Sequence, residues 1–517
     1  MTVRRGLLPR FFEFPDIVGC LQCVNFQHIT GCIRSPSHFS CPNMSTSRIA
    51  TTLLFFALAN FILAQQEQQI AVPAAAITDI LALDLEPDHG SSEEQLIVSI
   101  SSNQLAKLEQ RGVNYELLSV PSRGGLFTMS QIEWSQRERA SATMVPHDAY
   151  LSYDLYEERM QAFADSYPEI CKLHQLGQLE SGRRILALEI TDRPEVEEVE
   201  PKVFYTSTMH GDELAGYPLM LFLAEELLTS YGQNSELTEL VNETEIWINP
   251  LANPDGTYAA GNHTVNGSTR RNANGVDLNR NFPDPDDGEH PDGQLHQEET
   301  KIFMKFHQLI SFDLSCNLHT GAEVFNYPWD TYGQTHPDDA WWRYIGREFA
   351  DEIHENCNDR HFFRQLNNGI TNGYAWYHVS GGRQDYVNYF HRGREATLEI
   401  EGQKALSPAE LERLWQSSRH SLIGFIQQSG YGLRGVVTDA KTGDPLRAQI
   451  RIPGHDELNS EVFSKLPTGR YHRYLKAGTY TFEFSAPGYE TQTFTRSIED
   501  DTPTFLDVEL KPEAEVR

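Results

Sequence analysis

Alternation between short apolar runs and longer segments of helical periodicity dominates residues 148–429. The strand-like runs in this region are rich in β-branched and aromatic residues and stand at 185–190, 202–206, 244–249, 311–316 and 396–400. The clearest helical pattern, at 214–230, repeats its apolar residues at the spacing of one helix face. Strands that alternate with helices predict an α/β domain in which helices cover a largely buried sheet.

The segment before this domain has a different pattern. Within residues 65–147 we predict a strand at 95–101, a helix at 103–110 and a second strand at 115–118, so that a small α+β region with a βαβ-like order results. A polar stretch at 131–142 follows as a linker. By position this region is either a removable prosegment or a permanent accessory domain.

The segment after the α/β domain, residues 430–512, consists of short apolar strands between turns rich in Gly and Pro. We place these strands at 435–439, 448–452, 478–484 and 504–510. Short strands at this spacing predict a small all-β sandwich.

An apolar run near the N-terminus resembles a secretory signal peptide. Residues 44–64 begin with Met44, carry one positive charge at Arg48, continue with the apolar run 49–63 and end in the small residue Ala64. The run is too short for a typical membrane span. We therefore expect a secreted or periplasmic protein that has no membrane span in its mature form.

The signal-like segment begins at an internal methionine, which changes how residues 1–43 are interpreted. A signal peptide does not work from behind a long extension, so we interpret 1–43 as an over-long gene model, and Cys20 and Cys23 as its artefact rather than a zinc cluster. The remaining cysteines, Cys171, Cys316 and Cys357, allow at most one internal disulfide, so the fold does not depend on bridges.

Length and charge restrict the classes of function. A chain of 517 residues is too long for one core. Its 73 acidic and 42 basic residues give a net charge of −31, which repels nucleic acid and attracts cationic substrates. The simpler explanation of this charge is solubility in a salty or extracellular setting. We expect a monomer without a nucleic-acid partner.

Two short motifs contain candidate metal ligands. His210 and Glu213 stand three residues apart, so one turn of backbone can direct both side chains to the same point. His319 follows the predicted strand 311–316 and supplies a second imidazole. Two histidines and one carboxylate are the ligand set of a catalytic zinc site that leaves a fourth position open for water. The pair alone is also common on solvated helix faces, and only its context makes it significant.

The context is a series of motifs that the chain shares with one family. In chain order they lie at 210–213, 253–256, 270–283, 319, 376–377, 381–385 and 397–399. With them the chain resembles the zinc metallocarboxypeptidases, and within these the carboxypeptidase N/E regulatory branch. The resemblance implies a mixed-sheet α/β/α catalytic domain at 148–429, a transthyretin-like sandwich at 430–512, and one Zn²⁺ per chain. It further implies hydrolysis of the last peptide bond at the C-terminus of a peptide or protein.

The resemblance also assigns roles around the metal. His210, Glu213 and His319 match the zinc ligands, and Glu399 matches the general base. Glu401 lies on the same face of the predicted strand and is the rival candidate.

Cationic and aromatic positions match the substrate-binding residues of the family. Arg270 corresponds to the residue that stabilises the oxyanion, although Arg271 beside it is a second cation. Asn279 and Arg280 correspond to the pair that binds the free C-terminal carboxylate, for which a guanidinium is suited. Tyr377 matches a mobile tyrosine that closes over the terminal residue. The alternative is an aromatic side chain packed beside Trp376.

Two further positions bear on specificity. Asp330 falls where the N/E branch carries an acid that faces a basic substrate side chain, and Gln384 matches a second pocket position. These matches imply release of C-terminal Lys or Arg. Arg383 stands where relatives have Met, and it would neutralise Asp330 if it turned inward. The alternative for Asp330 is a surface acid in a loop.

Two other functions remain open at this point. One is an amidase or peptidase of the same fold with a preference for acidic or cell-wall peptides. The other is a non-catalytic peptide-binding homologue, which the presence of every expected ligand and catalytic residue disfavours.

Overall fold

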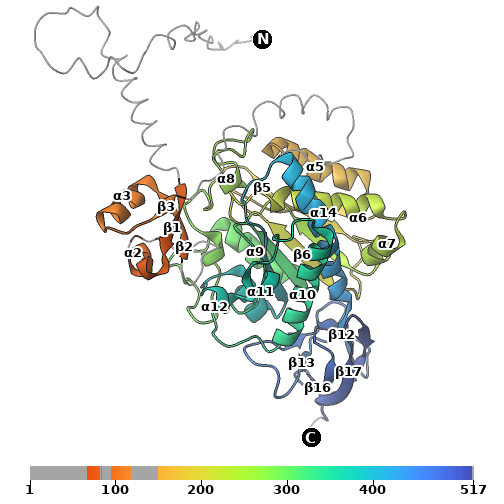
Figure 1. Cartoon of the computed structure of the whole chain (residues 1–517). Coiled ribbons are helices and arrows are strands. Elements are labelled where there is room, and N and C mark those ends of the chain that lie inside the picture. Colours follow the sequence, from red (N-terminus) through yellow and green to blue (C-terminus); the bar gives the residue numbers. More distant parts are fainter. Residues whose placement is uncertain (1–66, 82, 84, 86–94, 118–149, 515–517) are drawn as a thin grey trace, which may run out of the picture. The chain divides into compact units, whose positions relative to one another are not determined.

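The computed structural model describes residues 67–81, 83, 85, 95–117 and 150–514 (Figure 1). The predictions for 1–43, for the signal-like segment 44–64 and for the linker at 131–142 lie outside the described residues.

A mixed eight-stranded sheet forms the centre of the α/β domain, in the order β10-β9-β11-β8-β6-β7-β5-β4. Strands β6, β7, β8 and β11 run parallel. On one side, β9 is antiparallel to β11 and parallel to β10; on the other, β5 is antiparallel to both β7 and β4. The strands are β4 Cys171–Gln178, β5 Arg184–Ile190, β6 Lys202–Ser207, β7 Glu245–Asn249, β8 Leu314–His319, β9 Ala322–Tyr327, β10 Ile370–Asn372 and β11 Arg394–Glu401. The predicted mixed-sheet α/β domain is confirmed.

The strands that the sequence predicted are β5, β6, β7, β8 and β11, whose residues are almost all buried. Three strands were missed. β4 mixes Lys, His and Gln with its apolar residues, β9 contains Glu323 and Asn326, and β10 has only three residues. None of them forms a continuous apolar run. Strands β4 and β10 lie at the edges of the sheet, whereas β9 is an inner strand interrupted by polar residues.

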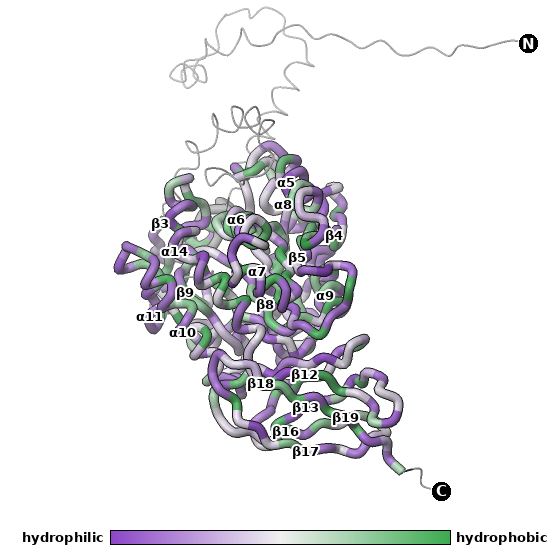
Figure 2. Tube along the Cα trace, turned by 90° about the vertical axis from the view of Figure 1, so that its right-hand side faces the viewer, coloured by the Kyte–Doolittle hydropathy of each residue, from purple (hydrophilic) through white to green (hydrophobic). Residues whose placement is uncertain are grey.

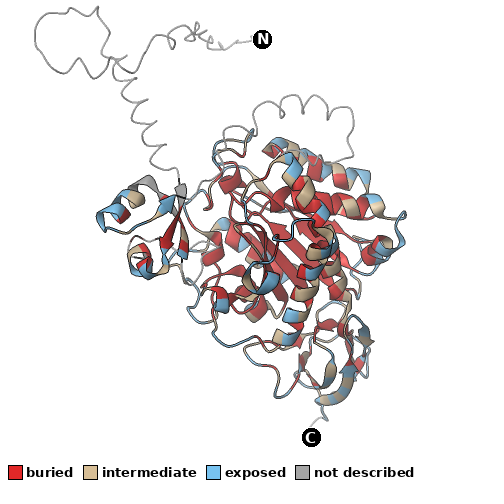
Figure 3. Cartoon of the chain, in the orientation of Figure 1, coloured by how far each residue is buried: buried red, intermediate tan, exposed pale blue. Residues whose placement is uncertain are grey.

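Helices cover both faces of this sheet (Figure 3). Successive strand residues point to opposite faces, and β6 shows the result: the Phe204 ring lies 5.3 Å from that of Phe306 in α9, while the Tyr205 ring lies 5.7 Å from that of Phe425 in α14. The helices are α5 Tyr153–Ser166, α6 Gly216–Ser230, α7 Ser235–Asn242, α8 Pro254–Thr257, α9 Glu298–Ile310, α10 Asp339–Asn356, α11 Gln365–Gly369, α12 Gly373–Trp376, α13 Arg383–Tyr386 and α14 Pro408–Gln427, with short turns η4 Leu278–Arg280, η5 Val387–His391 and η6 Gln428–Gly430.

The C-terminal strands form two four-stranded sheets around one apolar core (Figure 2). One sheet holds β12 Gly432–Asp439, β15 Arg470–Arg473, β18 Pro503–Phe505 and β19 Val508–Leu510, and the other holds β13 Gln449–Arg451, β14 Val462–Phe463, β16 Gly478–Ser485 and β17 Gln492–Ile498. The single strand predicted at 504–510 is wrong, because the chain divides there into β18 and β19. The Asp507 side chain accepts the backbone N–H of Val436 at 3.0 Å in place of a ladder bond.

The N-terminal region contains β1 Glu67–Pro73, η2 Ala74–Ala76, α2 Ile77–Leu81, β2 Gln95–Ser101, α3 Ser102–Gln110 and β3 Glu116–Leu117. The predicted βαβ-like order is confirmed as β2, α3 and β3, but one further strand was missed. Strands β2 and β3 are not neighbours, since each pairs antiparallel with β1, which was not predicted. Only Ile70, Ala71 and Val72 form the apolar part of β1, too short a run to stand out in the sequence.

Buried ion pairs connect the α/β domain to the sandwich, and we call them the interdomain ion pairs. Asp338 accepts hydrogen bonds from Arg394 at 2.8 Å and from Arg473 of the sandwich at 2.6 Å. Asp313 pairs with Lys465 and Arg470 of the sandwich. Burial raises the pKa of both carboxyl groups, but the neighbouring cations lower it more, so both pKa values end well below their ordinary range.

The interdomain ion pairs lie at the amino ends of the central parallel strands. Asp313 directly precedes β8, and its Oδ2 also accepts the backbone N–H of Lys202, the first residue of β6, at 2.9 Å. Arg394 is the first residue of β11. The sandwich therefore contacts the starting points of three strands, and the opposite ends of these strands lead into the candidate site.

Replacing Asp338 by Asn should destabilise the protein strongly, because two buried guanidinium groups lose their shared charge partner. Breaking a buried pair in this way costs about 3–5 kcal/mol. The matched control is Asp339→Asn. Among the described residues, the partly exposed Asp339 forms an ion pair only with Arg343, at 3.8 Å, so this change should alter stability by less than about 0.5 kcal/mol. Calorimetric unfolding measures both. Equal stability of the two variants would contradict this role for Asp338.

Candidate metal and catalytic site

The loop after β6 positions the first two metal-ligand candidates. Thr208 adopts a left-handed conformation with φ 62°, which is rare for a β-branched residue. Gly211 then passes so close to Gly256 that a Cβ atom would lie 2.4 Å from its carbonyl carbon. Asn253 and Thr257 hold the loop through hydrogen bonds to the carbonyl oxygens of Met209 and Gly211, at 3.2 and 2.9 Å. The HGDE sequence is thus fixed from both sides.

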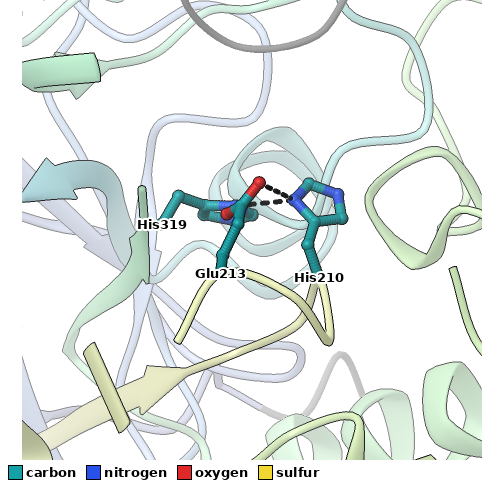
Figure 4. Close-up of side chains that lie close together, drawn as sticks. All are labelled: His210, Glu213 and His319. Carbon is teal, nitrogen blue, oxygen red and sulfur yellow. Dashed lines mark hydrogen bonds and ion pairs between the residues drawn. The ribbon is translucent and has the colours of Figure 1, made fainter. Parts of the chain in front are cut away.

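His210, Glu213 and His319 direct their ligand atoms to one point (Figure 4). Nδ1 of His210 lies 2.9 Å from Oε1 of Glu213, Nδ1 of His319 lies 2.9 Å from Oε2, and the two nitrogens are 3.0 Å apart. All three side chains are at most 1% exposed. Two imidazole nitrogens and a carboxylate that converge in a buried place match the chemistry of a zinc ligand set.

A second group of possible ligands, Asp338, His455 and Asp456, lies among the interdomain ion pairs. Here the guanidinium groups of Arg394 and Arg473 already compensate the carboxylates. This group is an ion-pair network rather than a metal site.

Asp277 orients one of the ligands, a role that the sequence analysis did not assign. Its Oδ1 lies 3.0 Å from Nε2 of His210, and its Oδ2 accepts Nε of Arg270 at 2.9 Å. Such a carboxylate fixes the tautomer and direction of a metal-bound histidine. Burial raises the pKa of Asp277, but Arg270 and His210 lower it to well below its usual value. In the sequence, the position of Asp277 inside the motif 270–283 was the feature that could have indicated this role.

Arg270, rather than Arg271, faces the metal ligands. Nη1 of Arg270 donates to Oε1 of Glu213 at 3.1 Å, and the side chain is buried. Arg271 instead donates to the carbonyl oxygen of Gly275 in an exposed position. Arg270, and not Arg271, is therefore the arginine beside the metal-ligand candidates.

Glu399 and Glu401 have different surroundings. Glu399 lies opposite His319 in the register of β11 and β8. Burial and the nearby charge of Glu213 raise its pKa well above the ordinary value, and Arg270 lowers it in part. Glu401, by contrast, accepts a hydrogen bond from Arg413 at 2.9 Å. Of the two, Glu399 is the carboxylate beside the metal ligands.

The candidate carboxylate-binding residues lie on the turn η4 next to the metal ligands. Asp277 caps this turn by accepting the backbone N–H of Asn279 at 2.9 Å. Nη1 of Arg280 donates to the carbonyl oxygen of Asn279 at 3.0 Å. Tyr377 packs edge-on against Trp376, with ring centroids 5.0 Å apart, and lies within electrostatic range of Arg280 and Glu399. Tyr377 thus both packs on Trp376 and borders the site.

Asp330 is buried at the site, not a surface acid. Its Oδ1 accepts hydrogen bonds from Gln384 at 3.0 Å and from Asn326 at 3.1 Å. Gly373 leaves it room, since a Cβ there would lie 1.7 Å from Oδ1. Burial raises the pKa of Asp330 to about 7, while the hydrogen bond from Asn326 lowers it in part. Asn326 was not predicted as a hydrogen-bond partner of Asp330.

Arg383 turns away from Asp330. Its Nε donates to Glu395 at 2.8 Å, and its guanidinium carbon lies 5.5 Å from the ring centroid of Phe204 in β6. The side chain is fully buried. A buried guanidinium requires a carboxylate partner, and Glu395 supplies it.

Loss of one ligand should empty the metal site. His319→Ala removes one of three protein ligands, so we expect the purified protein to contain almost no zinc, against about one zinc per chain before the change. Elemental analysis by mass spectrometry measures the content. His361→Ala, an exposed histidine elsewhere on the domain, is the control and should retain full zinc. Near-stoichiometric zinc in the His319→Ala protein would refute the ligand assignment.

Comparison with known proteins agrees with this geometry. The family model described as zinc carboxypeptidase matches residues 156–421. The carboxypeptidase N catalytic chain of Mus musculus is 34% identical over 399 residues, which are 69% of this chain and 85% of that protein. Carboxypeptidase D of Mus musculus is 37% identical over 350 residues, 65% of this chain, and this match spans 25% of its own length.

Solved structures share the fold. Carboxypeptidase A from Helicoverpa armigera superposes with a TM-score of 0.55 at 18% identity and covers 70% of this chain and 97% of its own. Thrombin activatable fibrinolysis inhibitor gives a TM-score of 0.53 at 13% identity, over 70% of this chain and 98% of its own. From the ligand geometry and the matches to carboxypeptidases N and D, we conclude that the chain belongs to the zinc carboxypeptidase family, in its N/E regulatory branch.

Proposed function

We propose that this zinc carboxypeptidase releases C-terminal Lys or Arg from peptides or proteins. The observation that carries the specificity is the buried carboxylate of Asp330, which Gln384 and Asn326 hold by hydrogen bonds and which no described arginine or lysine pairs with in an ion pair. The relatives named carboxypeptidase N and carboxypeptidase D support the same branch.

In the proposed mechanism each part of the site has one task. His210, Glu213 and His319 would hold the zinc ion, which when bound would supply a water of lowered pKa and a Lewis acid for the scissile carbonyl. Glu399 accepts a proton from the attacking water and returns it to the leaving amine. Arg270, held between Asp277 and Glu213, stabilises the negative charge that develops on the carbonyl oxygen.

Other residues select the terminal residue of the substrate. Asn279 and Arg280 bind the free carboxylate, and a guanidinium offers two parallel N–H donors for it. A Cβ at Gly382 would lie 3.6 Å from Oδ2 of Asp330 and 3.7 Å from Oδ1 of Asn279, so the specificity acid and the carboxylate-binding amide are near neighbours. One terminal residue can therefore contact both. Tyr377 then covers it and excludes water.

The charge of Asp330 favours a cationic substrate side chain. A buried carboxylate without a cationic partner is unfavourable, which is why its pKa lies near 7. The ammonium group of Lys or the guanidinium of Arg would restore the ionised form. Preference for acidic C-termini would require a cation in this position, and Arg383 is committed to Glu395. This observation disfavours the alternative of an acidic or cell-wall peptide specificity.

We propose further roles for the remaining regions. Residues 430–512 are a transthyretin-like sandwich attached to the catalytic domain 148–429, and residues 44–64 direct secretion of a monomeric enzyme. No described helix combines the length and apolar character required to cross a membrane. Residues 65–147 are a prosegment or an accessory domain. N-terminal sequencing of secreted protein decides between these, since a start near 65 retains the region and a start near 140 shows its removal.

Glu399→Gln should abolish turnover while zinc and peptide binding persist, because an amide of the same shape cannot accept the proton. We expect a loss in kcat of about 10³-fold or more. Glu401→Gln is the matched control on the same strand and should retain activity within about tenfold. The measurements are steady-state kinetics, zinc content and peptide affinity. If Glu401→Gln were the inactive variant, the two roles would be reversed.

Asp330→Ala should erase the preference for basic C-termini. With the native chain, kcat/KM for blocked dipeptides ending in Lys or Arg should exceed that for Leu, Phe or Glu by about 10²-fold or more. In the variant this ratio should fall toward one, while activity on apolar C-termini persists or rises. Asp339→Ala serves as a surface control. A native enzyme that prefers Phe or Glu would overturn the specificity proposal without affecting the zinc assignment.

A further inference from the structure

A cavity of about 910 Å³ lies between the catalytic domain and the sandwich, away from the metal ligands. Its walls come from α9, from the segment after η5, and from the sandwich between Arg447 and Tyr474. The carboxypeptidase reaction uses none of these side chains.

The lining of the cavity is strongly basic. Six of its side chains are Lys or Arg and only two are Asp or Glu, in a chain whose net charge is −31. Basic residues that gather in one concave place, against the overall charge, produce a locally positive potential that concentrates anions.

Among the described residues, two of these cations have no carboxylate partner, and a third has only a long ion pair. Arg394 and Lys465 belong to the interdomain ion pairs. Among the described residues, however, Lys305 and Arg447 have no carboxylate within ion-pair distance. Arg392 approaches Glu461 only to 3.8 Å, and its buried Nε has no hydrogen-bond acceptor. The three residues come from α9, the η5–β11 connection and the sandwich.

An aromatic ring brings two of these cations together. The guanidinium carbon of Arg392 lies 6.0 Å from the centroid of Phe463, and that of Arg447 lies 4.3 Å from it. One arginine belongs to the catalytic domain and the other to the sandwich. Contact with the ring stabilises each guanidinium group and limits the positions that it can adopt.

A buried histidine in the lining also lacks hydrogen-bond partners. The side chain of His472 is 1% exposed, and neither ring nitrogen makes a hydrogen bond, although Nδ1 lies 3.7 Å from Asp313. Buried polar groups are normally satisfied. A polar occupant of the cavity would supply such a partner for His472.

We propose that this cavity binds a small molecule that carries two or more phosphate or sulfate ester groups, held by Arg392, Arg447 and Lys305. A guanidinium group matches such oxyanions with two parallel donors. Three cations on separate elements can contact more than one anionic group. The exposed side chains of Phe390 and Leu466 in the lining can contact the organic part of the molecule.

Calorimetric titration of the full chain tests the proposal with two probes, sucrose octasulfate for sulfate esters and fructose 1,6-bisphosphate for phosphate esters. We expect at least one probe to bind, with an affinity that falls as salt rises from 50 to 200 mM. Arg392→Gln/Arg447→Gln should weaken binding by about tenfold or more, and Lys305→Gln by several-fold. The control Arg451→Gln/Arg496→Gln removes the same charge from residues of the sandwich outside the lining and should stay within about twofold.

Several outcomes would overturn the proposal. One is the absence of binding of either probe at millimolar concentration. Another is unchanged binding in both Arg392→Gln/Arg447→Gln and Lys305→Gln, particularly if Arg280→Gln abolishes it, because the probe would then occupy the peptidase site. Binding of a hexaglutamate peptide but of neither ester would show that the cavity takes acidic peptides instead. The exposed Lys305→Gln variant keeps the test valid if the double variant does not fold.

Discussion

The parallel register of β6, β8 and β11 is the constraint on which the site depends. Their carboxyl ends meet at one edge of the sheet, and Glu399 stands directly opposite His319 in the β11–β8 pairing. Strand β6 leads into the loop that holds His210 and Glu213. Ligands and catalytic groups at the carboxyl ends of parallel strands are typical of open α/β sheets. A shift in the register of these strands would separate Glu213 and Glu399 from His319.

Buried carboxylates are paired with cations at both ends of those strands, and this pairing is the second main feature of the structure. At the carboxyl ends, Arg270 lies between Asp277 and Glu213. At the amino ends, Asp313 and Asp338 are surrounded by cations of the sandwich. Unpaired buried charges are costly, so the sandwich is required where it lies, as the partner of carboxylates that the catalytic domain buries.

The sequence predicted the central strands and the metal ligands because both have strong local signals. Continuous apolar runs marked β5 to β8 and β11, and the spacing of His210 and Glu213 with a remote His319 marked the ligand set. Strand β1, with its short apolar part, gave no such signal. The partner of Arg383 gave no such signal either, because the pair joins α13 to Glu395 in β11 and the direction of the Arg383 side chain depends on tertiary packing. The same holds for Asn326 beside Asp330.

We propose that this enzyme binds the free C-terminal carboxylate of its substrate before it hydrolyses the adjacent peptide bond. The most direct test compares kcat/KM for one peptide ending in Lys with that for the same peptide carrying a C-terminal amide. Amidation removes the charge that Arg280 and Asn279 would bind, and a site built for this group rejects the analogue that lacks it. We expect amidation to lower kcat/KM by about 10³-fold or more. Cleavage of the amidated peptide at a comparable rate would contradict it and indicate an endopeptidase or amidase.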